Sequence, residues 1–325
     1  MWGSMVGLLA GLLILIFSAD RFITGSASIA RNFAVSPLLI GLTIVGFGTS
    51  APEILVSGFA SWQGNSGLAI GNALGSNIAN IGLILGCTAV IAPVAVQSKM
   101  LKRELPILLA TSIACYLLVA DNYYLGVADG LAMLAGLLVF LSWLVHTAVR
   151  ERQMDSYSKA LEIDLPEILP KFQAWLFFAI GLTGLLFSSR LLVWSAVRIA
   201  NHFGVSDRVI GLTIVALGTS LPELAATLSS VLKKEDDLAL GNIIGSNMYN
   251  LLAVYPLPGL IAPGAVLDSV VDRDFPVMLA FTVALFIMAY SRKKKGKICR
   301  LEGGLLLLTY IGYQWLVYHK AMEFA

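Results

Sequence analysis

Charged residues are scarce in this 325-residue chain. Lys, Arg, Asp and Glu make up 13% of it, hydrophobic residues make up 58%, and the formal net charge is +2. These proportions exclude an ordinary soluble domain, and the near-neutral balance excludes a basic nucleic-acid-binding protein. The three cysteines have neither disulfide nor metal-site spacing. Together with a mean hydropathy of +0.82, the composition predicts an integral membrane protein.

Long apolar stretches account for most of the chain. A helix crossing roughly 30 Å of hydrocarbon needs about 20 mostly apolar residues. Ten stretches are candidates, at 3–19, 37–61, 68–94, 104–120, 125–148, 173–198, 209–231, 238–262, 275–291 and 303–318. The first lacks a cleavage-site pattern, so we expect a retained helix and not a signal peptide. The sequence therefore predicts an all-α membrane protein with ten transmembrane helices.

The chain repeats itself at an offset of 170 residues. GLTIVGFGTSAPE at 41–53 matches GLTIVALGTSLPE at 211–223 in ten of thirteen positions, and LAIGNALGSNIAN at 68–80 matches LALGNIIGSNMYN at 238–250 without a gap. Internal repeats of this kind are typical of transporters. Five spans per repeat is an odd number, so the second repeat must enter the membrane from the opposite side.

The predicted organisation is a first five-helix repeat at 1–149, a cytoplasmic connecting loop at 150–172 and a second, inverted five-helix repeat at 173–325. Of the 22 Lys and Arg residues, 17 fall in the loops after spans 1, 3, 5, 7 and 9. By the positive-inside rule this side is cytoplasmic, which puts both termini outside.

Only two acidic residues lie well inside the spans, Glu53 and Glu223, and they are repeat-equivalent. The other eighteen fall in loops or near span ends. A charged side chain in hydrocarbon costs at least a few kcal/mol unless it faces a cavity or a partner. A salt bridge from Arg190 or Arg198 in the sixth span is one possible partner. Otherwise, two carboxylates at matching depth require a cation.

Each glutamate follows a pattern typical of a helix start. Ser50 stands three residues before Glu53, with Pro52 between them, as in a capping box. The pattern could be a simple helix cap. A cap in the middle of a membrane, however, implies a broken helix whose freed carbonyl groups, near Thr49 and Thr219, need a cavity, water or an ion. Its occurrence in both repeats favours an ion site.

The second motif places polar residues on one helical face. Asn72, Ser76 and Asn80 are spaced by four residues, as are Asn242, Ser246 and Asn250. The intervening G-x-x-x-G patterns are typical of close helix packing. Close packing would bring these amide and hydroxyl oxygens to the glutamates. Calcium takes roughly six to eight oxygen ligands at about 2.3–2.6 Å, which this set and water can supply.

At these motifs the chain resembles the cation/calcium exchanger superfamily, in particular the compact bacterial inner-membrane branch of the sodium/calcium exchangers. The resemblance covers about 250 residues of both repeats. It implies a fold with broken helices around the ions. It also implies an antiporter of calcium and sodium that lies in the lipid bilayer and needs no cofactor and no obligatory protein partner. It implies ligand roles for Thr49, Ser50, Glu53, Ser76, Asn80, Thr219, Ser220, Glu223, Ser246 and Asn250, and main-chain carbonyl ligands at Gly46 and Ala216.

Departures from the family pattern sharpen these expectations. Potassium-dependent relatives carry aspartate at the position of Asn250, which disfavours potassium dependence. Pro256 and Pro258 replace Gly86 and Thr88, so we expect span 8 to end or kink differently from span 3.

Three alternatives to sodium/calcium exchange remain at this stage. One is an antiporter of calcium or another divalent cation coupled to protons, and a second is a passive cation channel. The third is an intramembrane hydrolase that uses Glu53 and Glu223 as an acid pair. The Thr-Ser hydroxyls beside each glutamate favour ion ligation, hence a transporter and not an enzyme.

Overall fold

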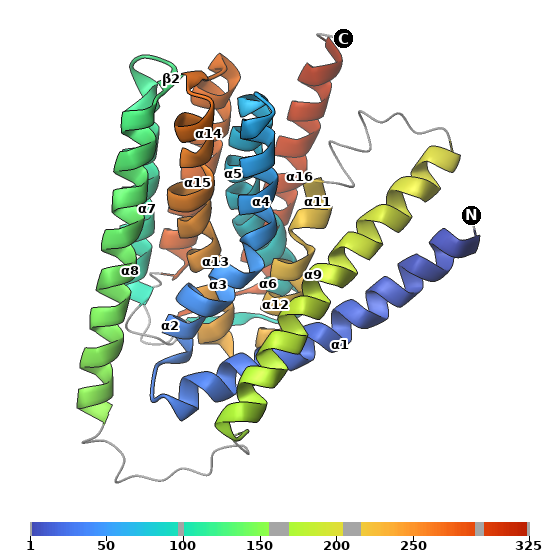
Figure 1. Cartoon of the computed structure of the whole chain (residues 1–325), viewed down its shortest axis with the longest axis vertical. Coiled ribbons are helices and arrows are strands. Elements are labelled where there is room, and N and C mark those ends of the chain that lie inside the picture. Colours follow the sequence, from blue (N-terminus) through green and yellow to red (C-terminus); the bar gives the residue numbers. More distant parts are fainter. Residues whose placement is uncertain (1, 97–100, 156–168, 204–215, 290–295, 324–325) are drawn as a thin grey trace.

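The computed structural model describes residues 2–96, 101–155, 169–203, 216–289 and 296–323. Nearly all of them are helical (Figure 1). The α-helices are α1 (Trp2–Asn32), α2 (Pro37–Ile40), α3 (Gly46–Thr49), α4 (Ala51–Trp62), α5 (Ser66–Ala79), α6 (Gly86–Ile91), α7 (Leu101–Ala120), α8 (Val127–Asp155), α9 (Lys171–His202), α11 (Ala216–Thr219), α12 (Leu221–Leu232), α13 (Asp236–Tyr249), α14 (Pro256–Ile261), α15 (Phe275–Ala289) and α16 (Arg300–Glu323). The π-helical segments are η1 (Gly41–Val45), η2 (Asn80–Leu85), η4 (Asn250–Val254) and η5 (Val270–Asp274).

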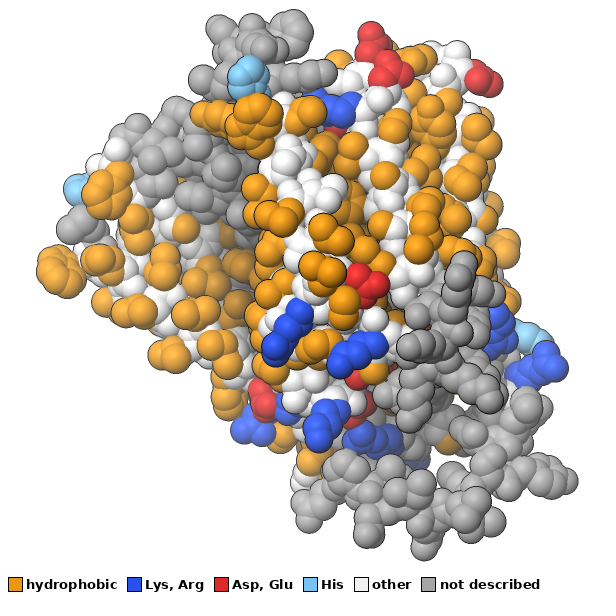
Figure 2. All heavy atoms as spheres, turned by 180° about the vertical axis from the view of Figure 1, so that it is seen from behind, with side chains coloured by type: hydrophobic (Ala, Val, Ile, Leu, Met, Phe, Trp, Pro, Cys, Tyr) orange, Lys and Arg blue, Asp and Glu red, His pale blue; other side chains and the backbone are white. Residues whose placement is uncertain are grey.

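The predicted helical membrane protein is confirmed. Within the described part of the chain, five helices are long and apolar enough to cross a membrane, or six if a bent pair counts as one span. Predicted span 7 begins in 204–215, outside the described residues. Figure 2 shows hydrophobic side chains over most of one face, with Lys and Arg mainly toward its lower part and several acidic side chains at its upper end.

Two short antiparallel pairings join segments distant in sequence. β1 (Val94–Val96) pairs with β4 (Gly296–Ile298), and β2 (Tyr124–Leu125) pairs with β3 (Gly264–Ala265). They link the end of α6 to the start of α16, and the α7–α8 connection to the segment after α14.

Helices α1 and α9 form a long tilted pair beside the more upright helices of the bundle (Figure 1). Glycines permit their close approach. A Cβ atom at Gly25 would lie 2.5 Å from the Phe178 backbone nitrogen, and one at Gly181 would lie 2.3 Å from the Phe22 backbone nitrogen. Any side chain at these positions would separate the two backbones.

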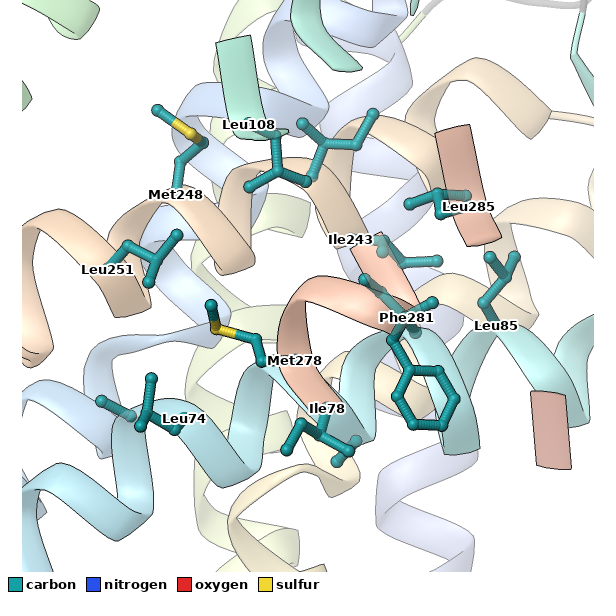
Figure 3. Packing of buried hydrophobic residues seen from close by; sticks show 14 of the residues in the cluster. Leu74, Ile78, Leu85, Leu108, Ile243, Met248, Leu251, Met278, Phe281 and Leu285 are labelled. Carbon is teal, nitrogen blue, oxygen red and sulfur yellow. The ribbon is translucent and has the colours of Figure 1, made fainter. Parts of the chain in front are cut away.

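The main hydrophobic core lies between α5, α13 and α15, where Figure 3 shows Leu74, Ile78, Ile243, Met278 and Phe281 packed together. All five side chains are buried. This core holds α5 and α13, which carry the asparagine and serine motifs.

The predicted helix break is present at both repeat positions. Residues Pro37–Thr49 and Ala51–Trp62 meet at Ser50 with a bend of 44°. The equivalent break falls at Ser220, between α11 and α12. A proline occupies one of the first two positions of the helix that follows each break, where it removes no helical hydrogen bond.

The two asparagine helices widen into π-helix at equivalent residues, Asn80 and Asn250. The expectation that span 8 ends or kinks differently from span 3 is wrong for the end, since both end at equivalent positions, Ile91 and Ile261. The two spans do differ locally, because η2 runs directly into α6 whereas Tyr255 separates η4 from α14. The prolines produce only a one-residue interruption at Tyr255, after which Pro256 begins α14.

Candidate ion-binding site

Two glutamates define the candidate site. Glu53 lies in the first turn of α4 and Glu223 in the first turn of α12. They are 1% and 3% exposed. The N-terminal end of a helix carries partial positive charge, which favours a carboxylate there. This contribution is small compared with the cost of burying a charge, so each carboxylate still needs a further partner.

The two carboxylates are close enough to interact electrostatically, and Thr49 interacts with Glu223. Both Oε atoms of Glu53 and Oε2 of Glu223 are buried without a hydrogen-bond partner among the described residues. The possible salt bridges from the sixth span are not formed within this part of the chain. Arg198 instead lies over the Trp194 ring, with its Cζ atom 4.3 Å from the ring centroid. Buried carboxylate oxygens without a protein partner are suited to bind a cation.

The serine at each break does not act as a simple helix cap. Ser50 and Ser220 occupy N-cap positions but make no side-chain capping hydrogen bond. The Ser50 Oγ atom is buried and has no partner in the described ranges. The capping-box explanation therefore fails for Ser50, and its hydroxyl is available to an ion.

Thr49 joins the first motif of one repeat to the second motif of the other. Its hydroxyl donates to Asn242 Oδ1 at 3.1 Å and lies 3.3 Å from Ser246 Oγ. Gly46 permits this contact, because a Cβ atom there would lie 3.1 Å from the backbone at Gly245 and Ser246. The Gly46 carbonyl accepts from the Ser50 backbone N–H at 3.1 Å and lies 3.4 Å from Thr49 Oγ1.

The asparagines at the two π-helical turns, Asn80 and Asn250, are both buried but differ in their hydrogen bonds. Asn80 donates through Nδ2 to Asn247 Oδ1 at 3.0 Å. Asn250 Oδ1 is buried without a partner within the described ranges. Asn247 was not among the predicted site residues, although the sequence contains a signal for it. The G-S-N element places Asn77 and Asn247 directly after Ser76 and Ser246 in both repeats.

The first asparagine of each motif, Asn72 or Asn242, hydrogen-bonds to the helix that carries the glutamate of the same repeat. Asn72 donates to the Glu53 carbonyl at 3.2 Å and to Ser57 Oγ at 2.9 Å. Asn242 donates to Thr227 Oγ1 at 3.0 Å in the equivalent arrangement. These bonds fix α5 against α4 and α13 against α12, which fixes the directions of the glutamates.

For the remaining predicted residues, the structure gives burial or position in a helix. Ser76 and Ser246 are buried, whereas Thr219 is partly exposed at the end of α11. Ala216 begins α11, and its side chain lies outside the described residues. The structure thus brings Glu53, Glu223, Thr49 and Ser246 together, while the full ligand set remains a prediction.

A sequence model described as "Sodium/calcium exchanger protein" matches residues 3–147 and 173–319. The chain belongs to this exchanger family. The two matched segments cover most of both predicted halves, and the gap between them, 148–172, contains the predicted connecting loop.

Full-length relatives agree with this assignment. The exchanger is 50% identical to the protein CaxA of Alkalimonas amylolytica over 310 residues, which cover 95% of this chain and 97% of that protein. It is 38% identical to the inner membrane protein YrbG of Escherichia coli over 314 residues, covering 95% and 96% respectively. The solved structure of the sodium-calcium exchanger NCX_Mj superposes with a TM-score of 0.81 at 33% identity, covering 95% of this chain and 96% of that one.

The exchanger's site combines little charge with many neutral oxygens. No group of three or more His, Cys, Asp or Glu side chains suited to a metal occurs in the described part of the chain. Two carboxylates give a formal charge of about −2 when ionised. Hydroxyl and amide oxygens complete such a site for a hard cation without adding charge.

Proposed function

We propose that the chain is a secondary antiporter that exchanges calcium for sodium by alternating access. The observation that carries this proposal is the pair of buried carboxylates, one from each repeat, with oxygens that have no hydrogen-bond partner among the described residues. The relation to NCX_Mj, a sodium-calcium exchanger, supports the choice of ions.

Charge balance explains why the two ions would exchange. A site of charge −2 is neutralised by one calcium or by two sodium ions, so the two ions compete. Without either ion, two bare carboxylates would have to pass through an occluded, low-dielectric state, which is strongly penalised. The loaded forms therefore change conformation readily and the empty form poorly, which couples the two fluxes.

The proposed ligands are the two glutamates together with the hydroxyl, amide and carbonyl oxygens around the two breaks. Thr49, Ser50, Ser246 and Asn250 have the strongest geometric support. Ser76, Asn80, Thr219, Ser220 and the carbonyls of Gly46 and Ala216 complete the set by resemblance to the family.

The proposed architecture has ten spans, in halves at 1–149 and 173–325 joined by a cytoplasmic loop at 150–172. Both termini would lie outside the cytoplasm, in a bacterial inner membrane. The basic side chains on one end of the molecule (Figure 2) and the relation to an inner membrane protein support this arrangement.

Replacing sodium tests the function directly. Proteoliposomes loaded with sodium and diluted into sodium-free buffer should take up calcium-45. Vesicles loaded with choline should not, because no counter-ion returns the carrier. Potassium should have no effect. Equal uptake in choline-loaded vesicles, without a pH gradient or internal calcium, would indicate a channel, and uptake driven by a pH gradient alone would indicate proton coupling.

Thiol labelling tests the topology. Arg150→Cys and Asp121→Cys both lie at exposed positions and would be made in a background without Cys87, Cys115 and Cys299. An impermeant thiol reagent should reach Arg150→Cys only from the cytoplasmic side and Asp121→Cys only from outside. Labelling of both from the same side would contradict five spans per repeat.

A further inference from the structure

Two ion pairs fasten α1 to the turn between α12 and α13. Lys233 Nζ lies 2.6 Å from Asp20 Oδ1 and donates to Thr24 Oγ1 at 3.0 Å. Eleven residues further along α1, Arg31 pairs with Glu235. The Arg31 and Glu235 side chains are mostly buried, at 25% and 15% exposure, so they are less screened by solvent than an ordinary surface pair. We name these four residues, Asp20, Arg31, Lys233 and Glu235, the cytoplasmic clamp.

The clamp lies on the side that the positive-inside rule assigns to the cytoplasm, since Arg31, Lys233 and Lys234 all fall in predicted cytoplasmic loops. Helix α1 also packs against α12, which carries Glu223. The clamp thereby fastens α1 to the end of a glutamate-bearing helix on the predicted cytoplasmic side.

The repeat supplies an internal comparison. At the offset of 170 residues, Asp20 corresponds to Arg190 and Lys233 to Gln63, while Arg31 corresponds to Asn201 and Glu235 to Asn65. An Arg–Gln pair and an Asn–Asn pair form no ion pair. Asn65 is moreover already used, because its Oδ1 accepts the Leu68 N–H at 3.2 Å at the start of α5. The inverted counterpart of the clamp on the outer side therefore lacks any pair of opposite charges.

The outer counterpart is also open. A cavity of about 540 Å³ lies between α4 and α9, lined in part by Gln63, Arg190 and Trp194. It extends to Pro52 and Thr219, which adjoin the two helix breaks of the ion site. The same pair of repeat-equivalent surfaces is thus fastened by ion pairs on one side and separated by a cavity on the other.

We infer that the cytoplasmic clamp positions α1 and sets the side to which the ion site opens. Its four residues act on transport through the position of α1 and touch no ion. While the clamp is intact, the resting exchanger favours the state that is open to the outside. This inference rests on the proposed exchange function and its inverted topology. Losing both ion pairs should shift the equilibrium between the two states roughly two- to thirtyfold toward the inward-open state.

The test replaces clamp residues by those of the outer side. Lys233→Gln and Arg31→Asn, singly and together, are made in a cysteine-free background carrying Ala60→Cys, a buried position that lines the outer cavity. An impermeant maleimide is applied from outside without sodium or calcium. The double variant should label roughly two- to tenfold more slowly than the parent, and each single variant should fall between them. The labelling rate follows the population of the outward-open state, which the parent already favours, so it falls by less than the equilibrium constant shifts.

Two controls separate positioning from general damage. Lys234→Asn removes a neighbouring positive charge that forms no ion pair within the described residues, and it should label at the parental rate. The charge exchange Asp20→Lys with Lys233→Asp should restore most of the rate lost in Lys233→Gln. An unchanged rate in the double variant, an equal loss in Lys234→Asn, or no restoration by the exchange would overturn the inference.

The labelling needs no transported ion, so its outcome is separate from that of the flux assay. Failure of sodium-driven calcium uptake with clamp-dependent labelling would reject the proposed function alone. Normal uptake with clamp-independent labelling would reject the clamp alone.

Discussion

Glu53→Gln and Glu223→Gln should each reduce sodium-driven calcium uptake by about a hundredfold or more. The substitution keeps the size of the side chain but removes one of two charges, which leaves a dehydrated divalent ion with half of its compensation. Leaving a buried charge without its partner typically costs about 3–5 kcal/mol, and 1.4 kcal/mol corresponds to a factor of ten in an equilibrium constant. Calcium-45 uptake into proteoliposomes measures the effect.

Protein quality is monitored separately in this experiment. Calcium should raise the melting temperature of the wild-type exchanger in detergent but not that of either glutamine variant, since only a bound ligand stabilises the folded state. Asp121→Asn, which removes an exposed carboxylate in the connection between α7 and α8, is the matched control and should transport normally. Near wild-type uptake by either glutamine variant would show that the two-glutamate site is wrong.

Gly245→Ala should destabilise the protein strongly although it adds a single methyl group. The new Cβ would lie 2.7 Å from the Leu42 carbonyl oxygen and 2.8 Å from the Leu42 Cα atom. Backbone atoms cannot rotate away as a side chain can, so α13 must separate from η1, and overpacking of this kind costs about 1–3 kcal/mol. We expect a melting temperature lower by about 2–5 °C for a chain of this length, together with weaker calcium binding because Ser246 moves away from Thr49.

Gly312→Ala is the control for this substitution. It lies on α16 with no heavy atom of the described chain within 4 Å of its would-be Cβ. Alanine also favours a helix over glycine by up to about 1 kcal/mol, so this variant should melt at or slightly above the wild-type temperature. Equal melting of the two variants would show that close packing at Gly245 does not limit stability.

Much of the site could be predicted from local sequence. Glu53 and Glu223 stand out because the other acidic residues fall in loops or near the ends of the predicted spans. The breaks at Ser50 and Ser220 follow from proline placed shortly after a serine in an apolar run. Both features depend on a few neighbouring residues, so the chain's order alone reveals them.

The hydrogen bonds between the two repeats could not be predicted from the sequence, because they depend on contacts between distant segments. The hydrogen bond from Thr49 to Asn242 and that from Asn80 to Asn247 exist because helices of the two repeats approach closely. No local pattern specifies that pairing. The prolines after Asn250 were expected to make span 8 end or kink differently. They interrupt the helix at Tyr255 but leave its end in place, because Pro256 falls at a helix start, where it needs no N–H partner.

The π-helical turn at Asn80 has a consequence for insertions and deletions. η2 adds a residue to the helical turn, so the face that carries Asn72, Ser76 and Asn80 does not continue beyond it. Gly82 instead faces α16, where a Cβ atom would lie 2.8 Å from Tyr310 Cβ. Deleting one residue between 81 and 85 would leave length and hydropathy almost unchanged. It would nevertheless rotate one half of the helix against the other. The same helix could then no longer both present its oxygens to the ion and pack Gly82 against α16.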